Sequence, residues 1–264
     1  MRVSQPIGVF DSGVGGMTVA KKIREMLPGE DLLYVADSRH APYGNKSQAF
    51  IVQRAHAIVN FMLQHQAKAI VVACNTATLV AIQPLRTNFT TPIIGVEPGI
   101  KPAALQTKSA VIGVMVTTRT SLSETFHQLV KRYSESVRIE VQACDGLVEL
   151  VETGDLDSHT TRALVASYVQ PLLAKGVDTI ALGCTHYPFL LALIQQIAGP
   201  DIGIIETGTA VAKQVVRRLT DEACLISDNQ AGTDVFFTTG DATANSALMS
   251  NLWGCPIKVN TCSI

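Results

Sequence analysis

The sequence predicts an α/β fold built from two similar parallel-sheet domains. Short runs rich in β-branched residues alternate with stretches of helical period, and parts of the first half recur in the second. Strands that alternate with helices form parallel sheets covered by helices on both faces. The chain has 264 residues, which is enough for two such domains, each with its own hydrophobic core.

Strands are expected where apolar and β-branched residues run together. These runs are Ile7–Phe10, Asp31–Ala36, Ala69–Cys74, Ile93–Val96, Val111–Val116, Arg138–Ala143, Thr179–Gly183 and Ile202–Glu206. Helical periodicity predicts helices at Thr18–Met26, Ser47–His65, Leu79–Asn88, Ser121–Ser134 and Asp157–Lys175. Ser47 is expected to cap the second of these helices, and Ser121 with Glu124 forms a capping-box pattern at the start of the fourth.

A repeat supports the two-domain organisation. Residues 69–78 and 179–188 each read as a buried strand, a cysteine, a polar turn and a helix, so that Cys74 and Cys184 lie 110 residues apart. Two further pairs of segments match at nearly this offset: Phe10–Ser12 with Val116–Arg119, and Tyr34–Asp37 with Val141–Asp145. A general likeness among parallel α/β strands is the alternative explanation, but the matching cysteines favour two duplicated halves related by pseudo-two-fold symmetry. Both cysteines then lie at the carboxyl ends of equivalent strands, where open α/β sheets bind ligands.

The composition argues against several classes of protein. Hydrophobic residues make up 47% of the chain, charged residues 16%, and the net charge is −1. A nucleic-acid surface normally shows as a basic excess, so no nucleic-acid partner is expected. The longest apolar stretches have about six to eight residues, far short of a membrane span, and the N-terminus does not read as a signal segment. We therefore expect a cytoplasmic protein without membrane association.

Common cofactor and metal motifs are missing from the sequence. The run Gly13–Gly16 follows a strand, but Thr18 stands where a dinucleotide fingerprint needs its last glycine, and no phosphate-binding lysine motif follows. Cys184 and His186 lack a second close pair of ligands, so no metal site is expected. None of the six cysteines forms a C-x-x-C pair, which argues against a zinc knuckle or a thioredoxin-type motif and favours reduced thiols.

The two cysteines in matching positions are the best candidates for chemistry. A lone cysteine at a strand end is usually a small buried hydrophobic residue. Cys74 and Cys184, however, each precede polar residues and an expected helix N-terminus, which stabilises a thiolate. The remaining cysteines lack this context and are interpreted as structural: Cys144, Cys224, Cys255 and Cys262. Two like groups related by a two-fold suit the inversion of a stereocentre, in which one group removes a proton from one face while the other protonates the opposite face.

Five motifs resemble those of glutamate racemases, within the aspartate/glutamate racemase superfamily, in both order and spacing. They are Val9–Gly16, Ala36–Gly44, Ala73–Ala77, Gly95–Gly99 and Gly183–Pro188. The match runs over most of the chain, from Ile7 to Gly240. The Cys74 motif is typical of the whole superfamily, whereas the motif around Cys184 resembles the glutamate branch.

The resemblance implies a fold and an activity. Two similar α/β domains, residues 1–97 with 207–264 and residues 98–206, would enclose the active site in the cleft between them. The activity would be the racemisation of L-glutamate to D-glutamate by a two-base mechanism, without a metal, pyridoxal phosphate or nucleotide cofactor. The product would supply peptidoglycan synthesis, and thereby cell-wall biogenesis and cell shape. The family also implies a homodimer.

The resemblance further implies roles for site residues. The cysteine that matches Cys74 takes the proton from D-glutamate, and the one that matches Cys184 takes it from L-glutamate. Asp11 is the carboxylate beside Cys74, and His186 is the imidazole beside Cys184; both are expected to contact the substrate. Two further carboxylates resemble auxiliary groups of the site: Asp37 and Glu152.

Substrate binding follows from the residue types in the motifs. They contain almost no Arg or Lys, so the two substrate carboxylates must be held mainly by backbone N–H groups, hydroxyls and helix N-termini. The candidate donors are Ser12, Tyr43, Gly44, Asn75, Thr76 and Thr185.

Other functions remain open from the sequence. A racemase for aspartate or a hydantoin would share the fold and the thiols and differ in its side-carboxylate contacts. A two-lobed amino-acid-binding protein of the periplasmic type would leave the paired cysteines unexplained. A third possibility is a protein partner, DNA gyrase, which some family members are reported to bind. The tail after Asp241 has little resemblance to the family and is expected to pack loosely.

Overall fold

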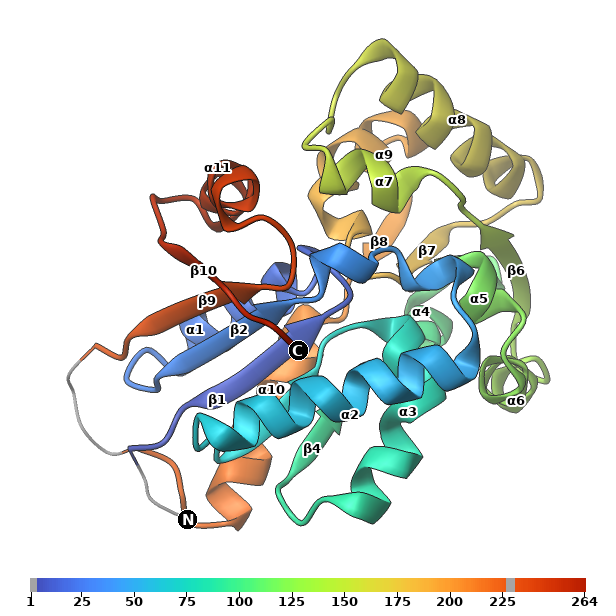
Figure 1. Ribbon diagram of the computed structural model, residues 1–264. Coiled ribbons are helices and arrows are strands. Elements are labelled where there is room, and N and C mark those ends of the chain that lie inside the picture. The colour runs from blue at the N-terminus through green and yellow to red at the C-terminus, as the bar shows by residue number, and fades with distance from the viewer. Residues whose placement is uncertain (1–3, 227–230) are drawn as a thin grey trace.

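The computed structural model describes residues 4–226 and 231–264, and within them the strands form two parallel sheets (Figure 1). Residues 1–3 and 227–230, which belong to the expected first domain, lie outside this description. Sheet A has the strand order β10-β9-β2-β1-β3-β4, and sheet B has the order β6-β5-β7-β8. The strands are β1 (Ile7–Asp11), β2 (Leu32–Ala36), β3 (Ala69–Val72), β4 (Ile93–Gly95), β5 (Val111–Val116), β6 (Arg138–Ala143), β7 (Thr179–Leu182), β8 (Gly203–Ile205), β9 (Asp234–Thr238) and β10 (Val259–Thr261). The strands expected between residues 7 and 206 are therefore confirmed to within two residues.

The two sheets repeat one topology. In sheet A, β1 pairs in parallel with β2 and β3, and β3 pairs with β4. In sheet B, β5 pairs in the same way with β6 and β7, and β7 pairs with β8. The order β2-β1-β3-β4 thus recurs as β6-β5-β7-β8, which confirms two similar parallel-sheet halves. Because sheet A takes its strands from residues 7–95 and 234–261 and sheet B from residues 111–205, we propose domain boundaries at 97/98 and 206/207.

Helices connect the strands and cover both sheets. They are α1 (Met17–Met26), α2 (Gln48–Gln64), α3 (Asn75–Asn88), α4 (Ile100–Gln106), α5 (Thr118–Ser121), α6 (Glu124–Tyr133), α7 (Leu147–Glu152), α8 (His159–Ala174), α9 (Leu191–Ala198), α10 (Gly208–Asp221) and α11 (Ala242–Trp253), with short 3-10 helices η1 (Ser38–His40), η2 (Tyr43–Asn45) and η3 (Tyr187–Leu190). Ser47 caps α2 as expected, since its hydroxyl accepts the N–H of Phe50 at 3.2 Å. Helix α3 begins directly after Cys74, one turn before the expected start at Leu79.

The expected capping box at Ser121 was wrong. The hydroxyl of Thr117 accepts the N–H of Thr120 at 3.3 Å and so starts the short helix α5 before Ser121 is reached. Ser121 is the last residue of α5, and its hydroxyl donates back to the Thr118 carbonyl at 2.9 Å. The longer helix α6 starts only at Glu124.

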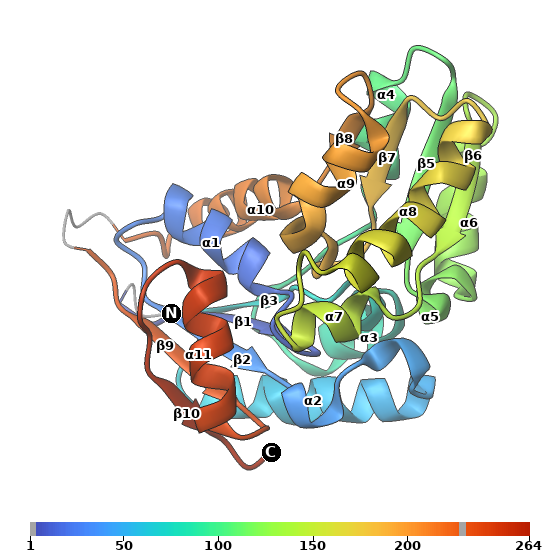
Figure 2. The same cartoon turned by 90° about the horizontal axis from the view of Figure 1, so that it is seen from above.

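Alternate residues of the central strand β1 face two different cores, as the period of a strand requires. Ile7 and Val9 join a core that includes α1, α10 and α11, whereas Phe10 joins a second core with α2 and α3. Figure 1 shows these helices on opposite faces of sheet A. In sheet B, α4 and α6 cover one face and α7, α8 and α9 the other (Figure 2).

The tail after Asp241 is well packed, contrary to the expectation from its weak family resemblance. The Asp241 carboxylate caps α11, and Met249 and Leu252 of that helix are buried in the core. Strand β10 then pairs in parallel with β9 and extends the edge of sheet A. A helix or strand packs onto the core when its apolar residues recur on one face. The residues of the tail do so, whether or not they resemble the family.

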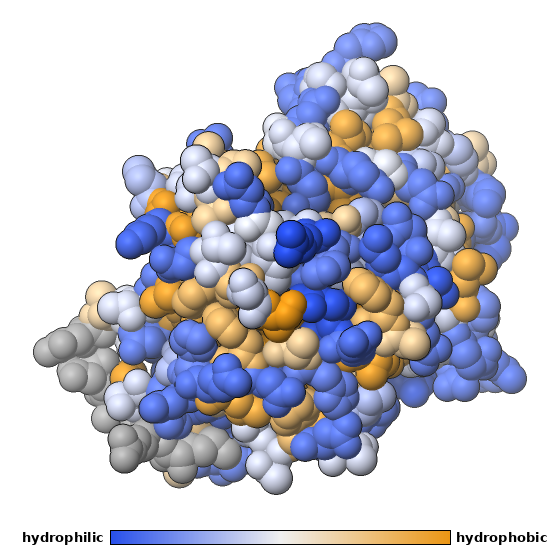
Figure 3. Space-filling view, in the orientation of Figure 1, coloured by the Kyte–Doolittle hydropathy of each residue, from blue (hydrophilic) through white to orange (hydrophobic). Residues whose placement is uncertain are grey.

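Hydrophilic and hydrophobic side chains are interspersed over the face seen in Figure 3. No helix among the described residues is long and apolar enough to span a membrane.

Candidate active site

The predicted site residues meet where the carboxyl ends of the two sheets approach each other. Cys74 follows β3 and Cys184 follows β7, the equivalent strands of the two sheets. Both thiols are buried, with 5% and 6% of the residue exposed. A hydrogen bond joins their surroundings, because the hydroxyl of Thr185, next to Cys184, donates to Asp11 Oδ2 at 2.7 Å.

The Cys74 half-site consists of Cys74, Ser12, Asp11 and the N-terminus of α3. The Cys74 thiol lies 3.8 Å from the Ser12 hydroxyl, which lies 3.3 Å from Asp11 Oδ1. The N–H of Ala77, in the first turn of α3, donates to Cys74 Sγ at 3.4 Å. Burial and then the Asp11 charge raise the pKa of Cys74 well above its ordinary value, against the lowering effect of that hydrogen bond. The helix N-terminus therefore acts in the expected direction but is outweighed, so Cys74 is a thiol here.

The Cys184 half-site consists of Cys184, His186 and Glu152. His186 Nδ1 lies 3.8 Å from Cys184 Sγ, and His186 Nε2 lies 2.6 Å from Glu152 Oε1. Burial alone would lower the pKa of His186, but its contacts with Cys184 and Glu152 outweigh burial and raise the pKa well above its ordinary value. An imidazolium beside Cys184 favours negative charge on its sulfur. The helix expected after Cys184 is present but starts later than α3 does after Cys74: the short 3-10 helix η3 begins at Tyr187 and α9 follows at Leu191. The group beside the Cys184 sulfur is therefore the His186 imidazole.

Hydrogen bonds join each half-site to residues of the opposite half of the molecule. The Thr185 hydroxyl donates to Asp11 Oδ2 at 2.7 Å, and the Val14 N–H donates to Glu152 Oε1 at 2.7 Å. The loop between β1 and α1 must approach closely to make these bonds. A Cβ at Gly13 would overlap the Glu152 carboxylate, and one at Gly15 would overlap the His186 ring. The glycine-rich run that fails as a dinucleotide motif thus permits close packing between the two halves.

Asp11 is buried completely between the two half-sites. Burial raises the pKa of its carboxyl above the ordinary value, although His186 and the hydrogen bond from Thr185 oppose this effect. Its Oδ1 also accepts the Gly13 N–H at 2.9 Å. Asp11 therefore contacts residues of both halves.

The expected hydroxyl and amide donors gather beside the thiols. Asn75 is buried, and neither its side-chain oxygen nor its nitrogen has a hydrogen-bond partner among the residues that the structure describes; such a group normally indicates a place for a ligand or water. Thr76 Oγ1 lies 3.0 Å from the Thr117 hydroxyl and 3.3 Å from the Thr120 hydroxyl. The sequence reasoning missed Thr117 and Thr120 as site residues. The repeat that equates Phe10–Ser12 with Val116–Arg119 carried the signal that could have found Thr117.

Asp37 lies apart from the thiols, in a set of polar contacts. Its Oδ2 accepts the Tyr43 hydroxyl at 2.6 Å, and Arg54 donates to both of its oxygens at 3.0 and 2.9 Å. Tyr43 and Gly44 form η2, and a Cβ at Gly44 would lie 3.5 Å from Cβ of Thr117. Asp37 connects to the site through Tyr43 and also directly, because its backbone N–H donates to the Asp11 carbonyl at 3.0 Å.

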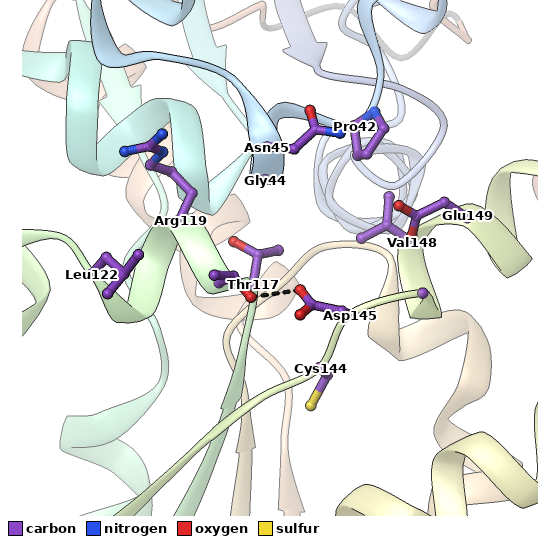
Figure 4. A pocket seen from close by; sticks show the side chains of 12 residues that line it. Pro42, Gly44, Asn45, Thr117, Arg119, Leu122, Cys144, Asp145, Val148 and Glu149 are labelled. Atoms are coloured by element: carbon purple, nitrogen blue, oxygen red, sulfur yellow. Dashed lines mark hydrogen bonds between the residues drawn. The ribbon is translucent and has the colours of Figure 1, made fainter.

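A pocket of about 460 Å³ opens between the two halves (Figure 4). Gly44 and Pro42 line it from the first half, and Thr117, Cys144 and Glu149 are among the lining residues of the second. Thr117 also contacts Thr76, two residues after Cys74, so the pocket reaches the start of α3, although neither Cys74 nor Cys184 is among its lining residues. A second pocket of about 730 Å³, between α3, α4 and α10, contains none of the predicted site residues.

Metal ligation finds no support in the described part of the chain. No group of three or more His, Cys, Asp or Glu side chains there could hold a metal ion. The remaining cysteines are dispersed: Cys144 lines the 460 Å³ pocket, Cys224 and Cys262 are buried elsewhere, and Cys255 is exposed.

Sequence and structure comparisons assign the chain to a family. The profile of the Asp/Glu/Hydantoin racemase family matches residues 7–215, so the chain belongs to this class of racemases. Within it, the chain is 52% identical to a glutamate racemase of Methylococcus capsulatus, over 94% of this chain and 92% of the relative. It is 50% identical to one of Herpetosiphon aurantiacus, over 90% and 93%. The chain is a member of the glutamate racemase branch.

Solved structures agree with this assignment. A glutamate racemase from Bacillus anthracis superposes with a TM-score of 0.88 at 33% identity, covering 98% of each chain. One from Thermus thermophilus, in complex with beta-chloro-D-alanine, gives 0.85 at 34% identity over 100% and 99%. One from Francisella tularensis, in complex with D-glutamate, gives 0.85 at 26% identity over 99% and 98%.

Proposed function

We propose that this protein racemises glutamate by a two-base mechanism in which Cys74 and Cys184 act on opposite faces of Cα. One observation carries the proposal: two buried thiols follow equivalent strands of duplicated sheets. Cys184 contacts the His186 imidazole, and Cys74 contacts Ser12, which in turn contacts the Asp11 carboxylate. Membership of the glutamate racemase branch supports the substrate.

For L-glutamate, the reaction begins with Cys184 as thiolate beside the His186 imidazolium and Cys74 as thiol. The Cys184 thiolate removes the proton from Cα, and the Cys74 thiol protonates the opposite face, so the Cα–H bond broken on one side is replaced on the other. Cys184 ends as thiol and Cys74 as thiolate, which is the state needed for the reverse reaction. The Cα–H bond next to a carboxylate is weakly acidic, so donors aimed at the developing carbanion and a closed, dry site must stabilise it.

The unpartnered Asn75 side chain is the best candidate for binding a substrate carboxylate. Its amide is buried without a partner, and this cost is recovered when a ligand accepts its hydrogen bonds. The hydroxyls of Thr76, Thr117 and Thr120 form an adjacent donor set. Ser12 and Thr185 already donate to Asp11, so their contribution to binding requires a shift of these bonds.

Further expectations follow from family membership alone. We propose that no cofactor is required, that the product supplies peptidoglycan synthesis, and that the protein is a cytoplasmic homodimer. Auxiliary roles for Asp37 and Glu152 are likewise proposed, with Glu152 acting through His186.

The substrate assignment is tested with purified, metal-free protein and no added cofactor. L-glutamate, L-aspartate and L-glutamine are incubated separately, and optical rotation is followed. Glutamate alone should lose its rotation, and EDTA or carbonyl reagents should leave the rate unchanged. Loss of rotation by aspartate instead, or inactivation by EDTA that zinc restores, would contradict the proposal.

A further inference from the structure

A buried polar cluster surrounds Asp37 in the first half of the molecule. We define the Asp37 cluster as Asp37, His40, Tyr43, Arg54 and Thr239. Asp37 Oδ1 accepts Arg54 Nη2 at 2.9 Å and the Thr239 hydroxyl at 2.8 Å, and lies 2.9 Å from His40 Nδ1. Its Oδ2 accepts Arg54 Nε at 3.0 Å and the Tyr43 hydroxyl at 2.6 Å. Both carboxylate oxygens are therefore fully used within the cluster.

These contacts fix the charge of Asp37. Burial alone would raise the pKa of its carboxyl, but hydrogen bonds from Arg54, Tyr43 and His40 outweigh burial and lower the pKa below its ordinary value. An anionic carboxylate with every acceptor site engaged is poorly suited to pass protons during a reaction. Its geometry instead suits a fixed anchor, because a bidentate Arg–carboxylate pair is both strong and directional.

The cluster joins segments that are far apart in the chain. Arg54 comes from α2, and Thr239 follows β9 of the returning C-terminal segment. The same Arg54 also donates through Nη1 to the main-chain oxygen of Ile264 at 2.7 Å, and Ile264 follows β10 in the chain. The C-terminal segment thus holds Asp37 from two sides, directly through Thr239 and indirectly through Arg54.

The anchored element is η2, which contains Tyr43 and Gly44. Tyr43 is buried and its hydroxyl ends on Asp37, while Gly44 lies against Thr117 at the wall of the 460 Å³ pocket. The position of this wall therefore depends on the Asp37 cluster.

We propose that Arg54 and Thr239 are positioning residues which, through Asp37 and Tyr43, hold η2 in place for binding of the amino-acid substrate. This inference rests on the proposed function and on the expectation from the sequence that Tyr43 and Gly44 help to bind the substrate. It assigns the C-terminal segment a role in binding and gives Asp37 an anchoring role. Proton transfer stays with the two cysteines.

The variant Arg54→Lys tests the proposal, because it keeps the charge but loses the two-pronged contact. KM for both enantiomers should rise about tenfold while kcat changes by less than about twofold, as expected when an interaction that positions a binding wall is weakened. Thr239→Val, which removes one hydrogen bond to Asp37, should shift KM in the same direction by a smaller factor. Thr239→Val also provides the test if Arg54→Lys fails to fold. Combined with Tyr43→Phe, the effect of Arg54→Lys should be less than additive.

Arg24→Lys is the matched control. Arg24 is partly buried and pairs with Asp234, so it also joins an early helix to β9, but it belongs to no part of the site. It should lower thermal stability while KM stays at the parent value. An unchanged KM in Arg54→Lys and Thr239→Val, or a loss confined to kcat, would overturn the inference while leaving the two-cysteine proposal intact. If Cys74→Ser and Cys184→Ser were active, the proposed function would fail instead.

Discussion

The two half-sites occupy equivalent places in duplicated sheets, yet they are chemically different. Cys74 has a helix N-terminus, a hydroxyl and a buried carboxylate around it, through Ala77, Ser12 and Asp11. Cys184 has an imidazole that is itself held by Glu152. The strands are arranged alike in the two halves, whereas the loops that carry the assisting groups differ between them.

This difference teaches that duplication sets the positions of the thiols while the loops set the groups around them. Burial and Asp11 raise the pKa of Cys74, and contacts with Cys184 and Glu152 raise the pKa of His186. A reaction that is nearly mirror-symmetric is then carried out by groups that are not. We expect the two directions of racemisation to depend on different residues.

The largest effect is expected from the thiols themselves. Cys74→Ser and Cys184→Ser each place a far weaker acid at the reacting face, so each should lose racemisation by about three orders of magnitude or more. Optical rotation of L- and D-glutamate measures the loss. Cys144→Ser is the control, since Cys144 is a third buried thiol that lines the pocket, and it should keep nearly the parent rate. A Cys184→Ser enzyme that racemises glutamate at near the parent rate would contradict a catalytic role for both thiols.

The assisting groups should give the next largest effect. Asp11→Asn and His186→Asn should each lower kcat by about a hundredfold or more, because each removes an acid–base partner. The ratio of forward to reverse kcat/KM remains fixed by an equilibrium constant of one, so the asymmetry must appear in kcat and KM separately or in deuterium isotope effects. Asp11→Asn should change the isotope effect most for the proton carried by Cys74, and His186→Asn most for that carried by Cys184. Equal isotope effects in both variants and both directions would contradict distinct half-sites.

Packing between the halves should have a smaller effect. In Gly15→Ala the new methyl group overlaps the His186 ring, so kcat should fall about tenfold as the imidazole shifts from Glu152 and Cys184. Gly176→Ala is the control: Gly176 has φ +81° but open space around it, so it should cost about 1 kcal/mol of stability without loss of kcat. Equal activity of the two variants would show that His186 tolerates displacement.

The smallest effect concerns the stability of the first half. Asp37 has a lowered pKa in the folded protein, so it stabilises the fold above the pKa of the unfolded carboxyl, near 3.8. That contribution is lost as pH falls through the folded value. The difference in thermal stability between the parent and Asp37→Asn should therefore stay constant from neutral pH to about pH 5 and shrink below about pH 4. A difference that grows on acidification would contradict an anionic anchor.

Much of the fold could be predicted because strand and helix periods are local signals. The repeat around Cys74 and Cys184 predicted the two matching sheets. Side-chain hydrogen bonds at helix starts were harder to predict. Both Thr117 and Ser121 can cap a helix, and only the contacts of Thr117 with Thr76 and Thr120 show that Thr117 is the cap. The tail after Asp241 was misjudged because a weak family resemblance says nothing about apolar period.

For the site, the sequence predicted which motifs lie together but not the hydrogen bonds between them. The sequence led us to expect Cys74, Cys184 and their neighbours to lie together, and they do. It could not show that Thr185 donates to Asp11, nor that Glu152 holds His186, since these contacts join residues more than thirty positions apart. Their roles in catalysis remain predictions.

The central claim is that two thiols act on opposite faces of Cα, and deuterium incorporation tests it most directly. L-Glutamate is turned over in D₂O, and the Cα position of both enantiomers is analysed by mass spectrometry or NMR during the first few per cent of conversion. If Cys184 removes the proton and Cys74 delivers one already exchanged with solvent, the early D-glutamate is deuterated while the remaining L-glutamate stays protonated. Early D-glutamate that carries the substrate's own hydrogen, or deuterium in unreacted L-glutamate, would contradict the two-thiol mechanism.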